Sequence, residues 1–208
     1  MGGRARAGSC EDSVGPQRVA PFGRRRGCGR PLPPGRSERR VGSLFTERAQ
    51  PAGTFSHDDA RIGYPGRTPD LYYGYAWDDS PNPYGAAGRV FGPGSIATHC
   101  SLSPFDLTSV LIISGPDIGT GVVSPAPSGV VDIAPTVAWM SGLTLKGMDG
   151  RVLSEAFSKG PDPEKIVVGR HRVVREAERI SRYLQFAELE TPESEVKRYL
   201  MEGGIQEA

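Results

Sequence analysis

The stretch TSVLIISG at residues 108–115 decides the fold class that the sequence predicts. It is a short, continuous apolar run with β-branched residues, and it ends at Gly115 and Pro116. Such a run, bounded by a turn signal, is typical of a strand that is buried on both faces in a parallel sheet. We therefore expect the middle of the chain to lie inside a layered α/β domain.

The segments on either side of this run supply further elements. Upstream, RTPDLYYGYAW at residues 67–77 places a turn before an aromatic, β-prone run, which predicts a strand. Residues 78–95 form a long polar, glycine-rich stretch, and loops of that length are usually functional or disordered. Downstream, GVVSPAPSGVVDIAPTVAWMSGL at residues 121–143 predicts a short strand, a turn and a helix. Strands that alternate with helices indicate a layered α/β sheet.

The predicted helix in residues 121–143 has signals at both of its ends. Asp132 is expected as the N-cap, Pro135 lies near the first turn, where proline is tolerated, and Gly142 can end the helix. One helical face is expected to be apolar, with Ile133, Val137 and Met140 on it.

The C-terminal part is predicted to be helical. Residues 148–157 are expected to form a short helix, and HRVVREAERISRYLQFAELE at residues 171–190 reads as an amphipathic helix that ends before Pro192. A second short helix is expected at residues 193–201. The apolar stripe of the longer helix would consist of Val173, Ala177, Ile180, Leu184 and Ala187.

The number of predicted strands sets a limit on the domain. Only two or three strands are expected between residues 70 and 135, which is too few for a doubly wound sheet that is stable alone. We therefore predict an incomplete α/β domain. Its parts are a disordered tail at residues 1–53, the α/β part at 54–160 and the amphipathic helices at 161–208.

Residues 1–50 differ in composition from the rest of the chain. They contain eleven arginines, no lysine and four acidic residues, so they carry about +7 of a total net charge of +1, and the remainder carries about −6. Such a stretch buries too little apolar surface to offset its ordering entropy. Three interpretations are open: a basic arm that contacts nucleic acid phosphates, a disordered tail, or GC-rich DNA translated in a wrong frame. We do not expect nucleic acid as a partner.

Cysteine content and hydropathy bear on location. Three widely spaced cysteines give no disulfide framework, which favours a reducing, cytoplasmic compartment. No apolar run approaches the length of a membrane span, so no membrane association is expected. The basic N-terminus has no apolar segment of the kind that a secretory signal contains.

Three histidines are the candidates for chemistry. His99 comes at the end of the long loop, just before the predicted buried strand, where it can serve as a metal ligand or an acid–base group. His57, beside Asp58 and Asp59, is expected in a solvated loop, because adjacent residues rarely converge on one ion. His171 is expected to be exposed. The sequence has no phosphate-binding glycine loop with lysine, no HExxH and no GxSxG.

Several segments together resemble one family. The chain is similar, over about half its length, to the C-terminal part of type I phosphodiesterases, or nucleotide pyrophosphatases, of the alkaline phosphatase superfamily. The segments that carry the resemblance, in family order, are RTPDLYY at 67–73, HCSLSPFD at 99–106, LIISGPD at 111–117, SGVVDIAPTVAWMSGL at 128–143 and MDGRVLSEAF at 148–157.

The resemblance implies a fold, a cofactor and a substrate class. It implies an alkaline-phosphatase-like parallel-sheet sandwich, here incomplete, that binds two metal ions, usually zinc, and cleaves small-molecule phosphoesters with a Thr or Ser nucleophile. The last metal ligand of the family is the histidine of a His-Gly pair, which matches His99. His99 is the one site residue that the resemblance carries over.

The departures from the family pattern shape the functional prediction. Cys100 stands where the family has glycine, and the Arg/Gly/Pro tract stands where the nucleophile and the upstream Asp ligands belong. One imidazole does not make a bimetallic site. We therefore expect a truncated phosphoric ester hydrolase by ancestry that is inactive alone. The alternatives are a competent hydrolase completed by another chain and a non-catalytic binding protein with a basic N-terminal arm.

Overall fold

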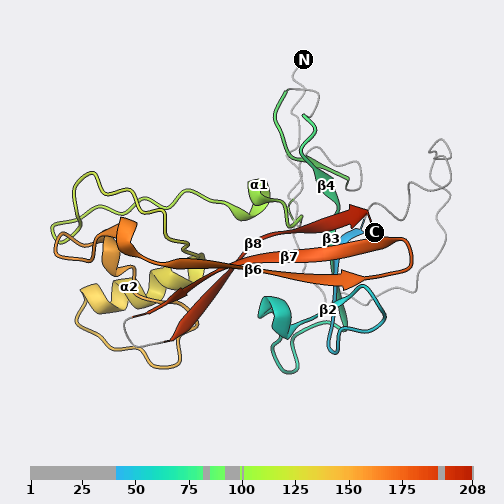
Figure 1. Ribbon diagram of the computed structural model, residues 1–208. Coiled ribbons are helices and arrows are strands. Elements are labelled where there is room, and N and C mark those ends of the chain that lie inside the picture. The colour runs from blue at the N-terminus through green and yellow to red at the C-terminus, as the bar shows by residue number, and fades with distance from the viewer. Residues whose placement is uncertain (1–40, 82–84, 92–98, 100, 192–194, 208) are drawn as a thin grey trace, which may run out of the picture. The chain divides into compact units, whose positions relative to one another are not determined.

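The computed structural model describes residues 41–81, 85–91, 99, 101–191 and 195–207. The chain divides into two compact units, Met1–Pro33 and Pro34–Ala208, and all described residues belong to the second. The described part of this unit is a mixed α/β structure with three small sheets and few helices (Figure 1), which confirms the predicted class at that level. No helix in the described ranges is long and apolar enough to cross a membrane.

The first sheet combines a predicted strand with an unpredicted one. Its order is β2 (Phe55–Ser56), β1 (Val41–Thr46) and β3 (Leu71–Tyr75), with β1 parallel to β2 and antiparallel to β3. Strand β3 confirms the strand expected in residues 67–77. Strand β1 corrects the predicted disorder of residues 1–53 at its C-terminal end, because VGSLFT buries alternate side chains against its neighbours. Residues 1–40 of that tail lie outside the described ranges.

The second sheet is a short antiparallel pair, β4 (Trp77–Asp78) and β5 (Arg89–Val90). Strand β4 overlaps the start of the stretch predicted as a loop at residues 78–95, and β5 lies inside that stretch. Between them, residues 82–84 are among those not described. The described residues between the two strands form a loop, as predicted. Asp78, Arg89 and Val90 were predicted in the loop but belong to strands.

The third sheet replaces the predicted C-terminal helices. It consists of β6 (Val168–Glu176), β7 (Ile180–Glu190) and β8 (Val196–Glu207), antiparallel and in that order. The helix predictions at 171–190 and 193–201 are wrong. The apolar residues of the stretch 171–190 fit a period of two as well as a period of 3.6, and its β-branched and aromatic residues favour a strand. The Ala177 N–H donates to the Ile180 carbonyl (3.0 Å), which closes the β6–β7 hairpin in the middle of the expected helix.

The principal core joins the first and third sheets. It consists of Phe45, Phe55, Leu184 and Phe186, with Leu102 and Leu200 packed against it. The Gly203 N–H donates to the Leu102 carbonyl (2.8 Å), and the Trp77 indole N–H donates to the Gly203 carbonyl (2.7 Å). A Cβ at Gly203 would lie 2.8 Å from methyl groups of Leu102 and Leu184, so glycine permits this close approach.

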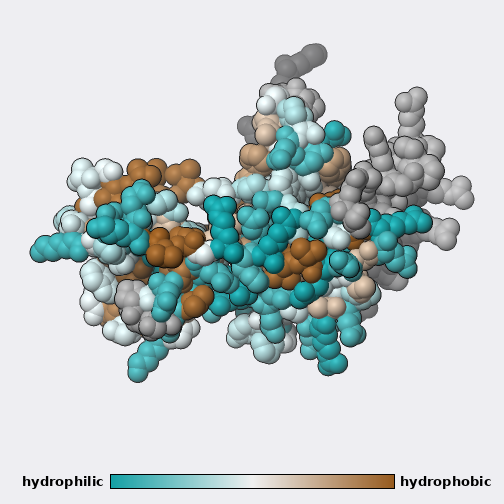
Figure 2. All heavy atoms as spheres, in the orientation of Figure 1, coloured by the Kyte–Doolittle hydropathy of each residue, from teal (hydrophilic) through white to brown (hydrophobic). Residues whose placement is uncertain are grey.

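The run at 108–115 is not a strand. It follows the short helix α1 (Pro104–Leu107) in an irregular conformation, and most of its apolar side chains are exposed, with Val110 at 86% and Ile112 at 84%. The prediction of a buried strand is wrong. A run that is apolar on both faces becomes a buried strand only where neighbouring strands or helices cover both faces, and no described element pairs with this run as a strand. Figure 2 shows exposed apolar side chains gathered around the helix α2 (Ile133–Met140) and the loops beside it.

Helix α2 confirms the predicted residues at its two ends and corrects the predicted apolar face. Gly142, in the left-handed region with φ of 70°, follows its C-terminus as predicted. Asp132 is the N-cap residue of α2, as predicted, although its side chain forms no capping hydrogen bond with the first turn of the helix. The expected apolar face is the wrong one, because Ile133, Val137 and Met140 are exposed while the buried residues are Pro135, Thr136 and Ala138.

Two smaller predictions on either side of α2 differ from the structure. No strand forms at the start of residues 121–143. Residues 148–157 contain a single 3₁₀ turn, η4 (Ser154–Ala156), instead of a helix. The other 3₁₀ turns within the described ranges are η2 (Asp58–Ala60), η3 (Val130–Asp132) and η5 (Pro163–Lys165).

The central position of Leu184 on β7 predicts its effect on stability. Leu184→Ala removes a fully buried side chain from the principal core, and we expect a loss of about 2–5 kcal/mol in the free energy of unfolding. Urea denaturation followed by circular dichroism measures this loss. The control is Val167→Ala at an exposed position, for which we expect a change within about 0.5 kcal/mol. Equal effects of the two substitutions would contradict the strand assignment of residues 180–190.

Candidate functional site

His99, the sequence-predicted metal ligand, is exposed. Its neighbour Cys100 lies outside the described residues. The residues that follow fold into a tight polar turn, in which the Ser101 hydroxyl and N–H both donate to the Asp106 carboxylate. The Ser103 hydroxyl accepts from the Asp106 N–H (3.1 Å) and caps α1. Ser101 also forms a parallel bridge with Tyr75 at the end of β3, so the turn after His99 is anchored to the first sheet.

No group of three or more His, Cys, Asp or Glu residues close enough to hold a metal ion occurs in the described ranges. A zinc ion in a protein is normally held by three or four side chains. The described residues therefore do not fit the two-zinc site that the family resemblance implies, and we derive no reaction step through zinc. His99 stays a prediction as a ligand.

His57 is buried, at 6% exposure, which corrects the predicted solvated loop. Its ring meets Tyr72 edge-on at 5.9 Å, and its Nε2 has no hydrogen-bond partner within the described part of the chain. Asp59 accepts from the Ser56 N–H (2.8 Å) and forms an ion pair with Arg175 (3.5 Å). This carboxylate therefore supports the fold around η2. His171 lies on β6 and is exposed as predicted, although on a strand.

The most extensive buried polar cluster lies beside α2. The Asp132 carboxylate, at 0% exposure, accepts from the Gly129 N–H (2.8 Å), the Arg151 N–H (2.8 Å) and the Tyr199 hydroxyl (3.1 Å). The Thr136 hydroxyl donates to the Asp132 carbonyl (2.6 Å) and accepts from the Leu153 N–H (3.0 Å). The start of α2, the segment at 151–153 and β8 are thereby joined.

Arg151 and Glu155 extend this cluster with a buried ion pair. The two guanidinium nitrogens donate to the two carboxylate oxygens at 2.8 and 2.6 Å, a bidentate geometry. Burial alone would raise the pKa of Glu155, but the hydrogen bonds and charge of Arg151 hold it below its ordinary value. Burial and the charge of Asp132 raise the pKa of Tyr199, so its hydroxyl stays protonated as a donor. The segment MDGRVLSEAF contained the pair at i, i+4 spacing, a signal that a search for helical ion pairs finds.

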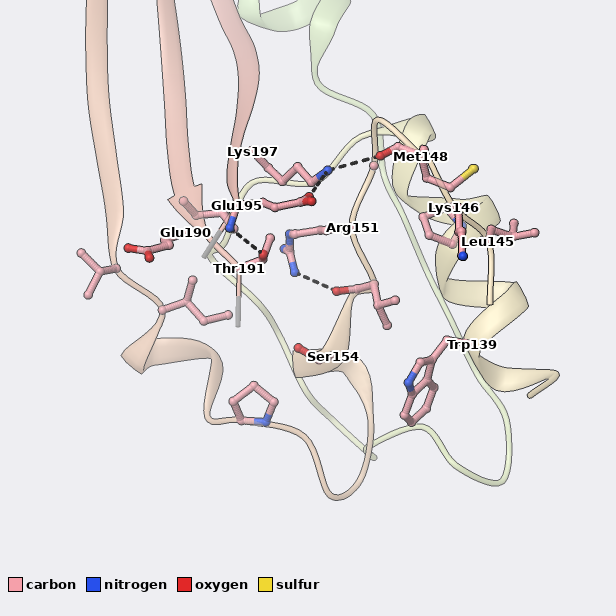
Figure 3. Close-up of a pocket in the computed structure, with 18 of the residues that line it drawn as sticks. Trp139, Leu145, Lys146, Met148, Arg151, Ser154, Glu190, Thr191, Glu195 and Lys197 are labelled. Atoms are coloured by element: carbon pink, nitrogen blue, oxygen red, sulfur yellow. Dashed lines mark hydrogen bonds and ion pairs between the residues drawn. The ribbon is translucent and has the colours of Figure 1, made fainter. Parts of the chain in front are cut away.

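A cavity of about 890 Å³ adjoins this cluster (Figure 3). In the close-up, Trp139 and Leu145 lie at one end, Lys197, Glu195 and Thr191 lie at the other, and Arg151 lies between them. Lys197 Nζ donates to the Met148 carbonyl (3.3 Å) and pairs with Glu195 (3.0 Å). The sequence did not indicate this cavity, because its residues come from α2, the loop after it and strands that were predicted as helices.

Comparisons with known protein families, with curated proteins and with solved structures find no match to this chain.

The Arg151–Glu155 pair predicts a large stability effect at neutral pH. Glu155→Gln leaves the Arg151 guanidinium buried without its countercharge, and we expect a loss of about 3–5 kcal/mol in the free energy of unfolding. Because the pKa of Glu155 is lowered in the folded chain, the stabilisation is complete above the ordinary carboxyl pKa and is lost as the pH falls through the lowered value. The difference between wild type and variant should therefore shrink in acid.

Urea titrations at several pH values measure this difference. Glu164→Gln, on the exposed turn η5, is the matched control and should change stability by less than about 0.5 kcal/mol at any pH. A Glu155→Gln variant as stable as wild type at neutral pH would show that the pair contributes nothing.

Proposed function

We propose that this chain is the C-terminal part of a metal-dependent phosphodiesterase of the alkaline phosphatase superfamily. In this proposal the described α/β unit is an incomplete part of the family's parallel-sheet sandwich. His99 is one ligand of its zinc site, and the chain alone does not hydrolyse phosphoesters. The substrate class of the complete enzyme is a small-molecule phosphoester.

The observation that carries the proposal is the bonding between two of the segments that resemble the family. The VDIAPT segment and the DGRVLSEAF segment meet through the Asp132 carboxylate, which accepts from the Arg151 N–H, and through the Thr136 hydroxyl, which accepts from the Leu153 N–H. Each segment thus supplies the hydrogen-bond partners that the other needs. Two segments that resembled the family only by chance would not be expected to form hydrogen bonds with each other in this way.

The exposed apolar surface supports the proposal that the domain is incomplete. Residues 101–145 contain no lysine or arginine and three acidic residues, and large apolar side chains along this stretch are exposed. Soluble proteins rarely leave contiguous apolar patches larger than a few hundred Å² open to water, unless the patch binds something. In our proposal the covering surface is the part of the sandwich that holds the nucleophile.

The proposed lack of activity follows from the ligand count. The Arg/Gly/Pro tract occupies the sequence positions where the family places its nucleophile and its Asp ligands. A single exposed imidazole holds zinc weakly, because catalytic zinc sites use three protein ligands and a water. The chain would therefore contribute the last ligand and its supporting turn to a site that needs other side chains.

Zinc binding and hydrolysis test the role of His99. We expect the purified chain to bind zinc weakly, His99→Ala to weaken this binding about tenfold or more, equivalent to about 1.4 kcal/mol, and no variant to cleave bis(p-nitrophenyl) phosphate. His171→Ala is the matched control, since His171 is an exposed histidine on β6, and it should bind zinc like wild type. Zinc titrations with a competing chelator and the release of nitrophenolate are the measurements.

Two results would overturn this part of the proposal. Stoichiometric zinc with turnover that is lost in His99→Ala would identify a competent hydrolase, the alternative in which other residues or another chain complete the site. Equal zinc affinity in wild type and His99→Ala would show that His99 is not a zinc ligand. Salt-dependent binding of a DNA or RNA probe that is lost on deletion of residues 1–40 would favour the binding protein with a basic arm.

The gene provides a test of ancestry. Translation of the DNA upstream of residue 55 in all three frames should reveal a Thr or Ser nucleophile segment and Asp-rich ligand segments of the same family. The expected result is such segments in a frame other than the one that encodes the Arg/Gly/Pro tract, or in frame further upstream. Their absence from every frame would contradict the proposed ancestry.

A further inference from the structure

The cavity beside α2 has the composition of a binding site for an organic ligand. Its wall contains nine apolar or proline residues, two glycines and eight polar or charged residues, and Lys197, Glu195 and Thr191 lie together at the end away from Trp139. Small-molecule sites likewise combine apolar walls with a few placed polar groups. The Trp139 ring packs on Phe157 at a centroid distance of 4.5 Å, while 55% of the tryptophan remains exposed. The other large apolar or proline residues of the wall are Pro135, Leu145, Met148, Val152, Pro161, Ile166, Val167 and Leu189.

Lys197 is the positively charged residue at the polar end of the cavity. Its side chain is 11% exposed, whereas the side chain of its partner Glu195 is 66% exposed. Bringing a charge out of water is costly unless a partner compensates it, and an exposed carboxylate is a weak, solvent-screened partner. The Lys197 ammonium is therefore poorly compensated for a cation at that depth, and a ligand carboxylate can replace Glu195.

The other charges around the cavity favour one negative charge on the ligand. Arg151 is neutralised by Glu155. The remaining charged side chains of the wall are three lysines and two glutamates, namely Lys146, Lys165, Lys197, Glu190 and Glu195. Their sum is one positive charge.

We propose that this cavity binds a small amphipathic anion, with its aromatic or branched apolar body beside Trp139 and its carboxylate on Lys197 in place of Glu195. The cavity is built from residues 135–197 and does not include His99. The inference is independent of the proposed phosphodiesterase ancestry.

Three probes that share one apolar body separate charge from shape. They are 4-phenylbutyrate, 4-phenylbutanol and 4-phenylbutylamine, added to the full chain while its tryptophan emission is recorded. We expect saturable binding of the acid, about tenfold tighter than the alcohol because of the charge-assisted contact with Lys197, and the weakest binding for the amine. Trp139→Phe should remove the emission change, which locates the signal in the cavity.

Two substitutions at the polar end test the assigned contact. Lys197→Met should make the acid and the alcohol bind equally, while Lys159→Met, an exposed lysine outside the cavity, should leave the preference unchanged. Glu195→Gln removes the competing carboxylate and should tighten binding of the acid severalfold without affecting the alcohol. This second variant retains the Lys197 side chain, so it tests the proposal even if Lys197→Met does not fold.

The outcomes that overturn the inference are specific. Equal affinities of the wild type for the acid, the alcohol and the amine would show an apolar surface with no anion preference. Absence of saturable binding of the acid at millimolar concentration would show that the cavity is not a site of this class. If the Glu195→Gln variant binds the acid no better than wild type does, the ligand carboxylate does not replace Glu195 on Lys197.

Discussion

The burial of the Asp132 carboxylate is the constraint on which the region around α2 depends. A carboxylate that is removed from water must recover its hydrogen bonds inside the protein. Asp132 accepts three, from the Gly129 N–H, the Arg151 N–H and the Tyr199 hydroxyl. These donors come from the turn before α2, the segment after its loop and strand β8. The three segments are therefore fixed together by one side chain, and the nearby cavity has its walls on the elements thus held.

A second interaction extends this constraint to the third sheet. Strand β7 lies between β6 and β8, and its Leu184 and Phe186 form the principal core together with Phe45 and Phe55. The other end of the same strand brings Leu189 against Tyr199 in a smaller cluster. One strand thus connects the apolar core of the first sheet to the polar cluster at α2. The hydrophobic contacts dominate at one end and the hydrogen bonds at the other.

Local signals in the sequence were sufficient for some elements and misleading for others. The helix at 133–140 and its end at Gly142 follow from short-range rules, because a proline near the first turn and a glycine after the last turn act on the backbone beside them. The strand at 71–75 follows from its aromatic residues. At 171–190, the apolar residues Val173, Ile180 and Leu184 fit a helical stripe, yet pairing with residues 196–207 decides the conformation, and strand pairing is a long-range interaction that propensity reflects only weakly.

The candidate sites illustrate the same limit. The burial of His57 depends on packing against Tyr72, and the cavity depends on Trp139 and Lys197 coming together across 58 residues of sequence. No pattern within one segment contains that information. The Arg151–Glu155 pair was the exception, because its spacing of four was visible in the sequence, although the structure places it at a 3₁₀ turn and not in the helix that the spacing suggests.

The exposed run at 108–115 has a consequence for the life of this chain in a cell. Residues 107–116 carry no charged side chain, and the nearest charges on either side are Asp106 and Asp117. Short apolar runs with β-branched residues, low charge and no internal proline pair readily with copies of themselves, and flanking charges oppose this self-association. A chain that keeps such a run open to water is a target for chaperones and proteases, and we therefore expect a surface that covers residues 108–115 to lengthen its lifetime.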